Sequence, residues 1–234
     1  MKLGIMQPYI FPYIGYFQLI NSVDRFVVYD DVTFIKQGWI NRNKILLKGE
    51  GHVFTVPLKS VSSYTTIAET EINHNLYEGW RNKFYKTLTQ AYAKAPYYKE
   101  AIEIIAVVLD SQCNTISELA ARSLVDTCKY IGVDTAFVST ATGYGNSGLK
   151  AEERVLDICK QEKAAVYINP IGGKELYSKE DFKKTGMELY FIRSRNITYT
   201  QFNATFVPWL SIIDVIMFNA PAEIKKFLNE YDLE

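Results

Sequence analysis

The residues best suited to chemistry in this chain are concentrated in its first 45 positions. Gln7 follows a short apolar run, and Tyr13, Gly15 and Tyr16 come after two prolines. A helix that starts near Gly15 would offer free backbone N–H groups to an anion, and the glycine would let a ligand approach the backbone closely. We therefore predict substrate contacts at Gln7, Tyr13, Gly15 and Tyr16. The alternative interpretation is a proline-kinked aromatic cluster in the core.

A pair of acids, Asp30 and Asp31, ends the second apolar run, residues 26–29. Adjacent residues on a strand point to opposite faces, so at most one of the two would face a crevice at the end of the strand, unless the strand has already turned. A carboxylate there could hold Mg²⁺ together with substrate phosphates, or accept a proton from an amine nucleophile. We predict that Asp30 or Asp31 is the catalytic base. Capping of a turn is the alternative role.

The third cluster occupies residues 36–44 and combines cations, amides and an aromatic ring. Arg42 offers a two-pronged donor to phosphate or carboxylate, and Trp39 offers a flat face to a base or sugar. This density of polar groups exceeds what a solvated turn needs. The predicted substrate-binding residues of the segment are Lys36, Trp39, Asn41, Arg42 and Asn43.

Two glycine-rich segments, 142–150 and 169–173, each follow a predicted strand. Such a turn exposes backbone N–H groups and can cradle an anion. The first segment lacks the Gly-Lys-Ser/Thr ending of a Walker motif. Because both turns should lie along the same edge of one sheet, we predict a shared ligand site to which Asn169, Gly172 and Gly173 contribute.

The elements that would position these groups follow from the apolar pattern. Short buried runs predict strands at 3–6, 26–29, 136–139, 165–168 and 188–192, with a helix at 15–21 between the first two. A strand–helix–strand unit of about 30 residues indicates parallel pairing with a right-handed crossover. We predict one α/β domain over residues 1–234, with a Rossmann-like, mostly parallel sheet and a helical insertion at approximately 76–131.

Further patterns predict elements around this core. Residues 44–58 predict a hairpin that runs into a third strand, and residues 65–72 predict an edge strand. Residues 209–218 and 222–231 predict two helices at the end of the chain.

The composition narrows the range of functions. The 26 Lys and Arg residues balance the 26 Asp and Glu residues, which argues against nucleic-acid binding by phosphate neutralisation. The three cysteines, Cys113, Cys128 and Cys159, have no spacing typical of a disulfide framework or a metal site, so a reducing cytoplasm is expected. No run approaches the ~18 apolar residues of a membrane-spanning helix. His52 and His74 lie apart from the polar clusters and are expected at the surface or in packing.

The start of the predicted first helix resembles a nucleotide site. Tyr13-Ile-Gly-Tyr16 occupies the place that His-x-Gly-His holds in nucleotidylyltransferases and class I synthetases, so the N-terminal βαβ unit resembles theirs. Both imidazoles are absent, and a tyrosine brings no positive charge near pH 7 to a phosphoryl transition state. Nucleotidyl transfer is for this reason a secondary hypothesis.

The chain as a whole resembles the WbqC-like family, which is found in bacterial clusters for O-antigen and other surface polysaccharides. The matching segments span nearly the whole chain and are Gln7-Pro8, 11–20, 29–31, 38–43, 55–57, 169–173, 176–177 and 211–215. The resemblance implies transfer of glycine, or a related acyl group, to the amine of a nucleotide-linked amino sugar. It brings no catalytic assignment with it.

The leading hypothesis is therefore an N-acyl or aminoacyl transferase with a nucleotide-linked amino sugar and an acyl or aminoacyl carrier as partners. Trp39 would stack on the base or sugar, Arg42 and the glycine turns would hold the diphosphate, and the six residues Gln7, Tyr13, Tyr16, Asp30, Trp39 and Arg42 would line one pocket. The source of activation stays open between ATP with Mg²⁺ and an acyl-carrier thioester. The alternatives are a nucleotidylyltransferase-like, ATP-dependent enzyme that activates a carboxylate or sugar phosphate, and a non-catalytic protein that binds sugar nucleotides.

Overall fold

The computed structural model describes residues 1–62, 64–202 and 205–234 and contains a central six-stranded sheet. Its strands lie in the order β5-β2-β1-β6-β7-β8. They are β1 (Lys2–Met6), β2 (Arg25–Val28), β5 (Ala136–Val138), β6 (Val166–Pro170), β7 (Glu188–Ser194) and β8 (Tyr231–Leu233). Neighbours from β5 to β7 pair in parallel, and β8 runs antiparallel to β7. The prediction of an α/β fold with a mostly parallel sheet is confirmed.

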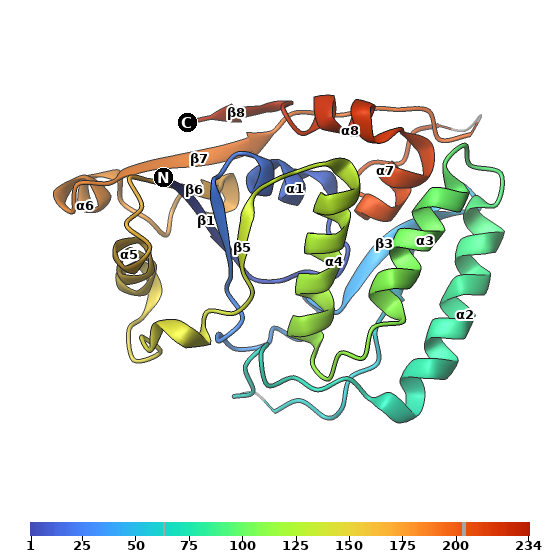
Figure 1. The fold of residues 1–234 in the computed structure, drawn as a ribbon, viewed down its shortest axis with the longest axis horizontal. Coiled ribbons are helices and arrows are strands. Elements are labelled where there is room, and N and C mark those ends of the chain that lie inside the picture. The colour runs from blue at the N-terminus through green and yellow to red at the C-terminus, as the bar shows by residue number, and fades with distance from the viewer. Residues whose placement is uncertain (63, 203–204) are drawn as a thin grey trace.

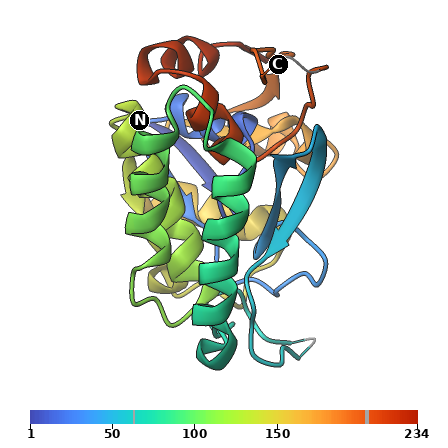
Figure 2. The same cartoon turned by 90° about the vertical axis from the view of Figure 1, so that its right-hand side faces the viewer.

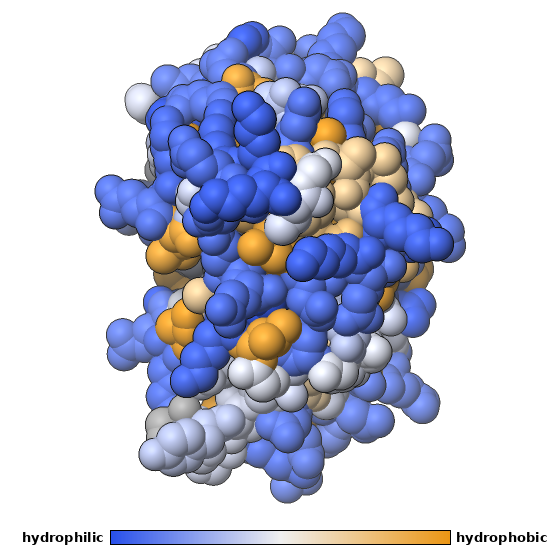
Figure 3. All heavy atoms as spheres, turned by 90° about the vertical axis from the view of Figure 1, so that its left-hand side faces the viewer, coloured by the Kyte–Doolittle hydropathy of each residue, from blue (hydrophilic) through white to orange (hydrophobic). Residues whose placement is uncertain are grey.

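Helices cover both faces of this sheet (Figure 1). On one face, α5 (Ala151–Gln161) and α6 (Lys179–Lys184) pack against strand residues that include Leu3 and Ile5. The outer surface on this side is mostly hydrophilic, with separate apolar spots (Figure 3). On the other face, α1 (Ile14–Asn21), α4 (Ile116–Ile131), α7 (Ile212–Phe218) and α8 (Pro221–Phe227) cover residues that include Phe26 and Ile168. Strands buried on both faces explain the continuous apolar runs of the sequence.

Three helices occupy residues 74–131, namely α2 (His74–Tyr92), α3 (Tyr98–Leu109) and α4. A capping box starts α4, because Thr115 and Glu118 each accept a hydrogen bond from the other's backbone N–H. The helix ends at Gly132, whose left-handed backbone suits glycine. In α2, the ring of Phe84 lies 4.5 Å from that of Phe54. The three helices share one apolar core with α1 and the sheet.

Three predicted elements differ from the structure. The hairpin of β3 (Arg42–Leu47) and β4 (Glu50–Thr55) forms a sheet of its own beside α2 and adds no strand to the central sheet (Figure 2). The edge strand at 65–72 is wrong, since the described pairing there consists of isolated bridges such as Leu58 with Ile72. The last predicted helix is shorter, because Tyr231 starts β8. Pairing with β7 there overrides the local helical pattern.

The segment between β1 and α1, residues 7–13, is fixed from three directions at Phe11. Asn43 Nδ2 and Ser211 Oγ both donate to the Phe11 carbonyl, at 2.9 and 2.6 Å. The Phe11 N–H donates to Ser123 Oγ at 3.0 Å. These bonds hold Phe11 at a φ of 40°, a strained backbone for a bulky residue. The aromatic residues on either side of Phe11 are thereby fixed relative to β3, α4 and α7.

Candidate functional site

The strand order reverses between β1 and β6, because the chain builds β2 and β5 on one side of β1, and β6, β7 and β8 on the other. In open α/β sheets, ligands bind beyond the carboxyl ends of the strands at such a switch point. A cavity of about 380 Å³ lies there, and we call it the switch-point cavity. Its lining residues are Met6, Tyr9, Tyr13, Gly15, Tyr16, Leu19, Pro170, Ile171, Gly172, Ile192, Arg193, Ser194 and Trp209.

The start of α1 forms one wall of the switch-point cavity, and Gly15 makes room there for Tyr13. A Cβ atom on Gly15 would lie 2.3 Å from Tyr13 Cε2 and 2.9 Å from its hydroxyl oxygen, so the ring lies directly against the helix start. Among the described residues, no side chain caps this helix. The Tyr16 N–H donates to the Tyr13 carbonyl at 3.0 Å, so among the described residues the N–H groups of Ile14 and Gly15 are the ones left without a protein acceptor. On its other side, the Tyr13 ring lies 5.8 Å from that of Trp209.

Two further tyrosines line the cavity beside Tyr13. The Tyr16 hydroxyl donates to the Gln7 carbonyl at 2.8 Å, and its ring lies 5.7 Å from that of Tyr9. Thus Gln7 contributes its backbone to the support of the wall. Burial raises the pKa of Tyr9, Tyr13 and Tyr16, most strongly that of Tyr16. All three hydroxyls therefore stay neutral and can donate hydrogen bonds across the physiological pH range.

The turn after β6 forms the opposite wall, in the 3₁₀ turn Ile171–Gly173. A Cβ on Gly172 would meet no heavy atom within 4 Å, whereas one on Gly173 would lie 2.0 Å from Asn169 Nδ2. That amide donates to the Pro170 carbonyl at 3.0 Å, and its oxygen accepts from the Tyr167 hydroxyl at 2.9 Å. Of the residues predicted in this turn, Gly172 lines the cavity, and the other two shape the turn.

Asp30 and Asp31 lie outside the lining of the switch-point cavity. The buried Asp30 carboxylate accepts from Ser117 Oγ at 2.6 Å, Thr140 Oγ1 at 2.8 Å and the Ala141 N–H at 2.9 Å. It thereby joins β2 to α4 and to the loop after β5.

Asp31 forms a largely buried ion pair with Arg154, on α5. The guanidinium carbon of Arg154 also lies 5.0 Å from the centre of the Tyr29 ring. Each acid of the pair thus has a partner that ties separate elements together, and neither approaches the cavity walls.

The predicted binding segment at 36–44 lies at the hairpin instead of at the cavity. Arg42 Nε donates to the Gly38 carbonyl at 2.9 Å, and its guanidinium lies 5.6 Å from the centre of the exposed Trp39 ring. The Asn41 amide donates to the Val56 carbonyl at 2.9 Å. The Asn43 amide is bonded to the segment before α1, as described above, and Lys36 is exposed.

The prediction that six residues line one pocket is therefore wrong. Of the six, Tyr13 and Tyr16 line the switch-point cavity. Asp30, Trp39 and Arg42 lie elsewhere because β3 joins a separate sheet and the Asp30 side chain turns toward α4.

Arg193 and Trp209, which the sequence analysis missed, also line the cavity. Arg193 lies at the end of β7, so another strand end on the same edge of the sheet was the available signal. Its Nε donates to Glu234 Oε1 at 2.8 Å, and Lys174 Nζ lies 2.7 Å from Oε2 of the same carboxylate. Arg193 and Lys174 thus share one acidic side chain, and Arg193 also lies opposite Asp232 in the pairing of β7 with β8. Trp209 is two-thirds exposed and has a φ of 61°.

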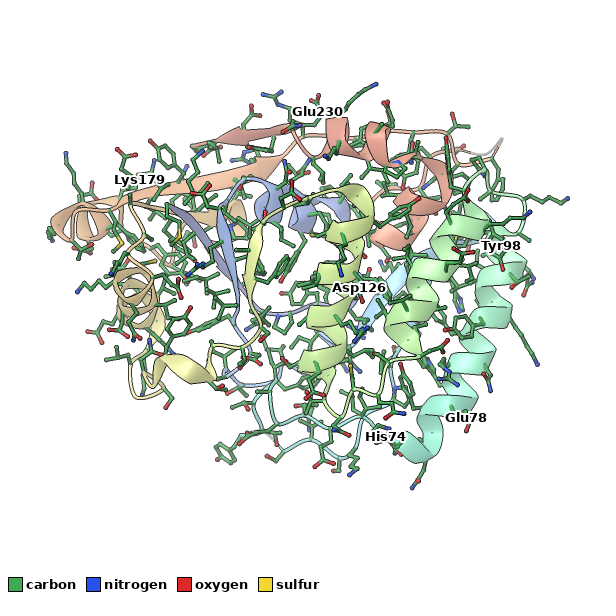
Figure 4. All side chains as sticks on the ribbon, viewed as in Figure 1. His74, Glu78, Tyr98, Asp126, Lys179 and Glu230 are labelled. Atoms are coloured by element: carbon green, nitrogen blue, oxygen red, sulfur yellow. The ribbon has the colours of Figure 1, made fainter. Side chains whose placement is uncertain are left out.

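The described residues provide no other evident chemical centre. They contain no group of three or more His, Cys, Asp and Glu side chains that could hold a metal ion. His74 lies at the start of α2, at the edge of the molecule opposite α8 (Figure 4). Among the described helices, none is long and apolar enough to cross a membrane.

Comparison with known proteins gives a family and one distant relative. The WbqC-like protein family matches residues 7–226. The uncharacterized protein Rv1507c of Mycobacterium tuberculosis is 28% identical over 231 residues, which cover 97% of each chain. No solved structure matches the chain.

Proposed function

Since the chain belongs to the WbqC-like protein family, we propose that it transfers an acyl group, with glycyl as the candidate, to the amine of a nucleotide-linked amino sugar. The acceptor would bind in the switch-point cavity. The observation that carries this proposal is the cavity itself, which is walled by tyrosines, an uncapped helix start and an open glycine turn.

The walls of the cavity support a sugar nucleotide as the ligand. Tyrosine and tryptophan rings offer apolar faces to a sugar or base, while their polar groups can bond to hydroxyls. The uncapped start of α1 and the unobstructed Gly172 backbone suit the oxygens of a diphosphate. Arg193, which lines the cavity, offers a guanidinium to the same oxygens. The strand order, which matches a dinucleotide-binding sheet with its last strand reversed, supports the same class of ligand.

The chemistry of the lining favours acyl transfer from a donor that is already activated. The described lining residues include no carboxylate, imidazole or primary amine. We propose that the sugar amine attacks as the neutral base and that the protein orients it. The neutral hydroxyl of Tyr13, between the start of α1 and Trp209, would donate to the carbonyl oxygen as negative charge develops there. This role replaces the catalytic base that we expected at Asp30 or Asp31.

The test is direct synthesis with purified protein. UDP- and dTDP-linked amino sugars are incubated with a glycyl thioester, and the acylated sugar is measured by mass spectrometry. Tyr13→Phe should lower kcat by about 10²-fold, with a small change in KM, because it removes one transition-state hydrogen bond. Tyr64→Phe, at a fully solvated ring, is the matched control and should behave as the parent protein.

Two results would contradict the proposal. Thermal stabilisation by a nucleotide sugar without turnover from a thioester or an ATP-activated donor would indicate a binding protein. Release of pyrophosphate from ATP and Mg²⁺ in the absence of an acyl acceptor would indicate the nucleotidylyltransferase-like alternative.

A further inference from the structure

A second cavity of about 310 Å³ lies directly beside the switch-point cavity. We call it the β7 cavity, because residues at and after the end of β7 form much of its wall. Tyr13, Ser194 and Trp209 line both cavities. Its volume falls at the lower end of the range of about 300–1,000 Å³ for small-molecule sites. The two cavities are therefore neighbouring compartments of one cleft.

The pair of rings from Tyr13 and Trp209 forms the partition between the compartments, with 5.8 Å between ring centres. Trp209 has a left-handed backbone, with a φ of 61°, which costs a bulky residue about 1–2 kcal/mol. The next residues hold it there, because Leu210 is buried and the Ser211 N–H donates to the Lys44 carbonyl at 2.8 Å. Strain of this kind, kept at an exposed aromatic residue, is typical of functional sites.

The outer wall of the β7 cavity is fixed by a buried carboxylate. Asp214, on α7, accepts from the Tyr199 hydroxyl at 2.7 Å, the Gln201 amide at 2.7 Å and the Tyr92 hydroxyl at 2.8 Å. Tyr199 itself lines the cavity. The wall is therefore held in place before any ligand arrives, which lowers the entropic cost of binding.

Each compartment is lined by one arginine, Arg193 in the switch-point cavity and Arg195 in the β7 cavity. Among the described residues that line the β7 cavity, Arg195 carries the only formal charge. Its Nε lies 3.1 Å from Asp232 Oδ1, and a second acid, Glu230, lies 3.7 Å from its Nη1. These two acids offset the charge of Arg195. A second phosphate group is therefore disfavoured in the β7 cavity.

The remaining walls suit an uncharged, partly apolar arm. Ile197, Phe206 and Leu210 provide apolar surface, and the exposed Asn196 and Thr198 can bond to amide groups. A pantetheine-like arm has these properties, since it combines short apolar stretches with two amides and ends in a thioester. The polarity of the compartment matches such an arm better than a nucleoside diphosphate.

We propose that the β7 cavity is the donor subsite and takes an acyl thioester on a pantetheine-like arm; the assignment rests on the proposed function. The sugar amine in the switch-point cavity attacks the thioester carbonyl carbon beside Tyr13. A C–N bond forms, the C–S bond breaks, and the proton lost by nitrogen ends on the sulfur as the thiol leaves. The reaction balances as amine plus thioester to amide plus thiol.

The test uses two variants, each of which obstructs one compartment with a bulky side chain. Thr198→Trp obstructs the β7 cavity, and Gly172→Trp obstructs the switch-point cavity, each at a residue that lines only that compartment. With S-glycyl-pantetheine and a UDP-amino sugar as substrates, Thr198→Trp should raise the thioester KM about tenfold or more, equivalent to about 1.4 kcal/mol, and leave the sugar KM within about twofold. Gly172→Trp should do the reverse. A shift of the same constant in both variants, or an unchanged thioester KM in Thr198→Trp, would overturn the subsite assignment.

A binding measurement keeps this test independent of turnover. Trp39→Phe and Trp80→Phe together leave Trp209 as the sole tryptophan of the chain. Added pantetheine should change the Trp209 fluorescence emission saturably. Thr198→Trp would add a second tryptophan, so Thr198→Phe is used as the obstructed variant in this measurement. Loss of the signal in that form supports the donor subsite even if no acylated sugar is produced, which would contradict only the proposed function. No saturable change in the parent, or the same change in Thr198→Phe, refutes the subsite.

Discussion

Replacement of Asp30 separates a structural carboxylate from a catalytic one. The side chain is 3% exposed and accepts three hydrogen bonds, from Ser117, Thr140 and Ala141. Asp30→Ala removes the acceptor and leaves these donors buried without a partner. Asp30→Asn keeps one oxygen for Thr140 and Ala141, and the Ser117 hydroxyl can turn to accept from the new amide.

The magnitude follows from these contacts. Hydrogen bonds to charged groups contribute about 1.5–3 kcal/mol each, but losses within one network are not additive, so Asp30→Ala should cost about 3–5 kcal/mol. In a chain of this length, about 2–4 °C of melting temperature corresponds to 1 kcal/mol, so Tm should fall by about 10 °C. Asp30→Asn should cost about 1–2 kcal/mol. Asp134→Ala, at an exposed acid, is the control and should stay within about 0.5 kcal/mol.

The assay combines urea unfolding with transferase activity at a temperature where every variant is folded. If Asp30 supports the fold, Asp30→Asn should retain activity within a few-fold of the parent protein. An Asp30→Asn variant of unchanged stability that loses 10²-fold or more in kcat would restore Asp30 as the base. An Asp30→Ala variant of parental stability would refute the hydrogen-bond network itself.

Three further predictions test other parts of the structure. Gly15→Ala should displace the Tyr13 ring and lower kcat by about 10²-fold, whereas Gly79→Ala, in open space on α2, should leave kcat unchanged in the same assay. Burial raises the pKa of Asp214, so its contribution to stability is largest at low pH and is lost as pH rises through the folded pKa. The stability of the parent protein relative to Asp214→Asn, measured by urea unfolding from pH 4 to pH 8, should therefore decline with rising pH; a constant or growing difference would contradict the shift. Of the three thiols, Cys113 should react first with a thiol reagent at pH 8, because it is the least buried. Burial raises the pKa of all three thiols, to about 12 for Cys128 and Cys159, so these two should react only in denaturant. Rapid modification of two or three thiols in the folded protein would show that the core packing is wrong.

The sequence predicts the inner strands β1, β2, β6 and β7 well because each contains a local apolar run that is largely buried. It fails at β8, since three residues at the sheet edge become a strand only through pairing with β7. The same limit explains the absent strand at 65–72. Local sequence can favour an extended backbone, but a strand forms only where the tertiary fold places a second strand beside it.

In the candidate site, too, the residues that depend on local features were predicted and those that depend on long-range contacts were not. Tyr13, Gly15, Tyr16 and Gly172 are accessible to sequence reasoning because helix starts and glycine turns after strands are local features. Asp30 follows a strand, as predicted, but its carboxylate accepts a hydrogen bond from Ser117, 87 residues away in the sequence. The place of a residue at a strand end does not reveal such a partner.

Trp209 shows the limit of reasoning from local sequence most clearly. Its ring meets Tyr13, nearly 200 residues earlier in the chain, only because Ser211 bonds to both β3 and the segment before α1. No local pattern encodes this contact, yet the two rings separate the cleft into two compartments. The cleft that the sequence predicts as a single nucleotide site is thus, in the structure, a site with room for two ligands, and a transfer reaction needs two.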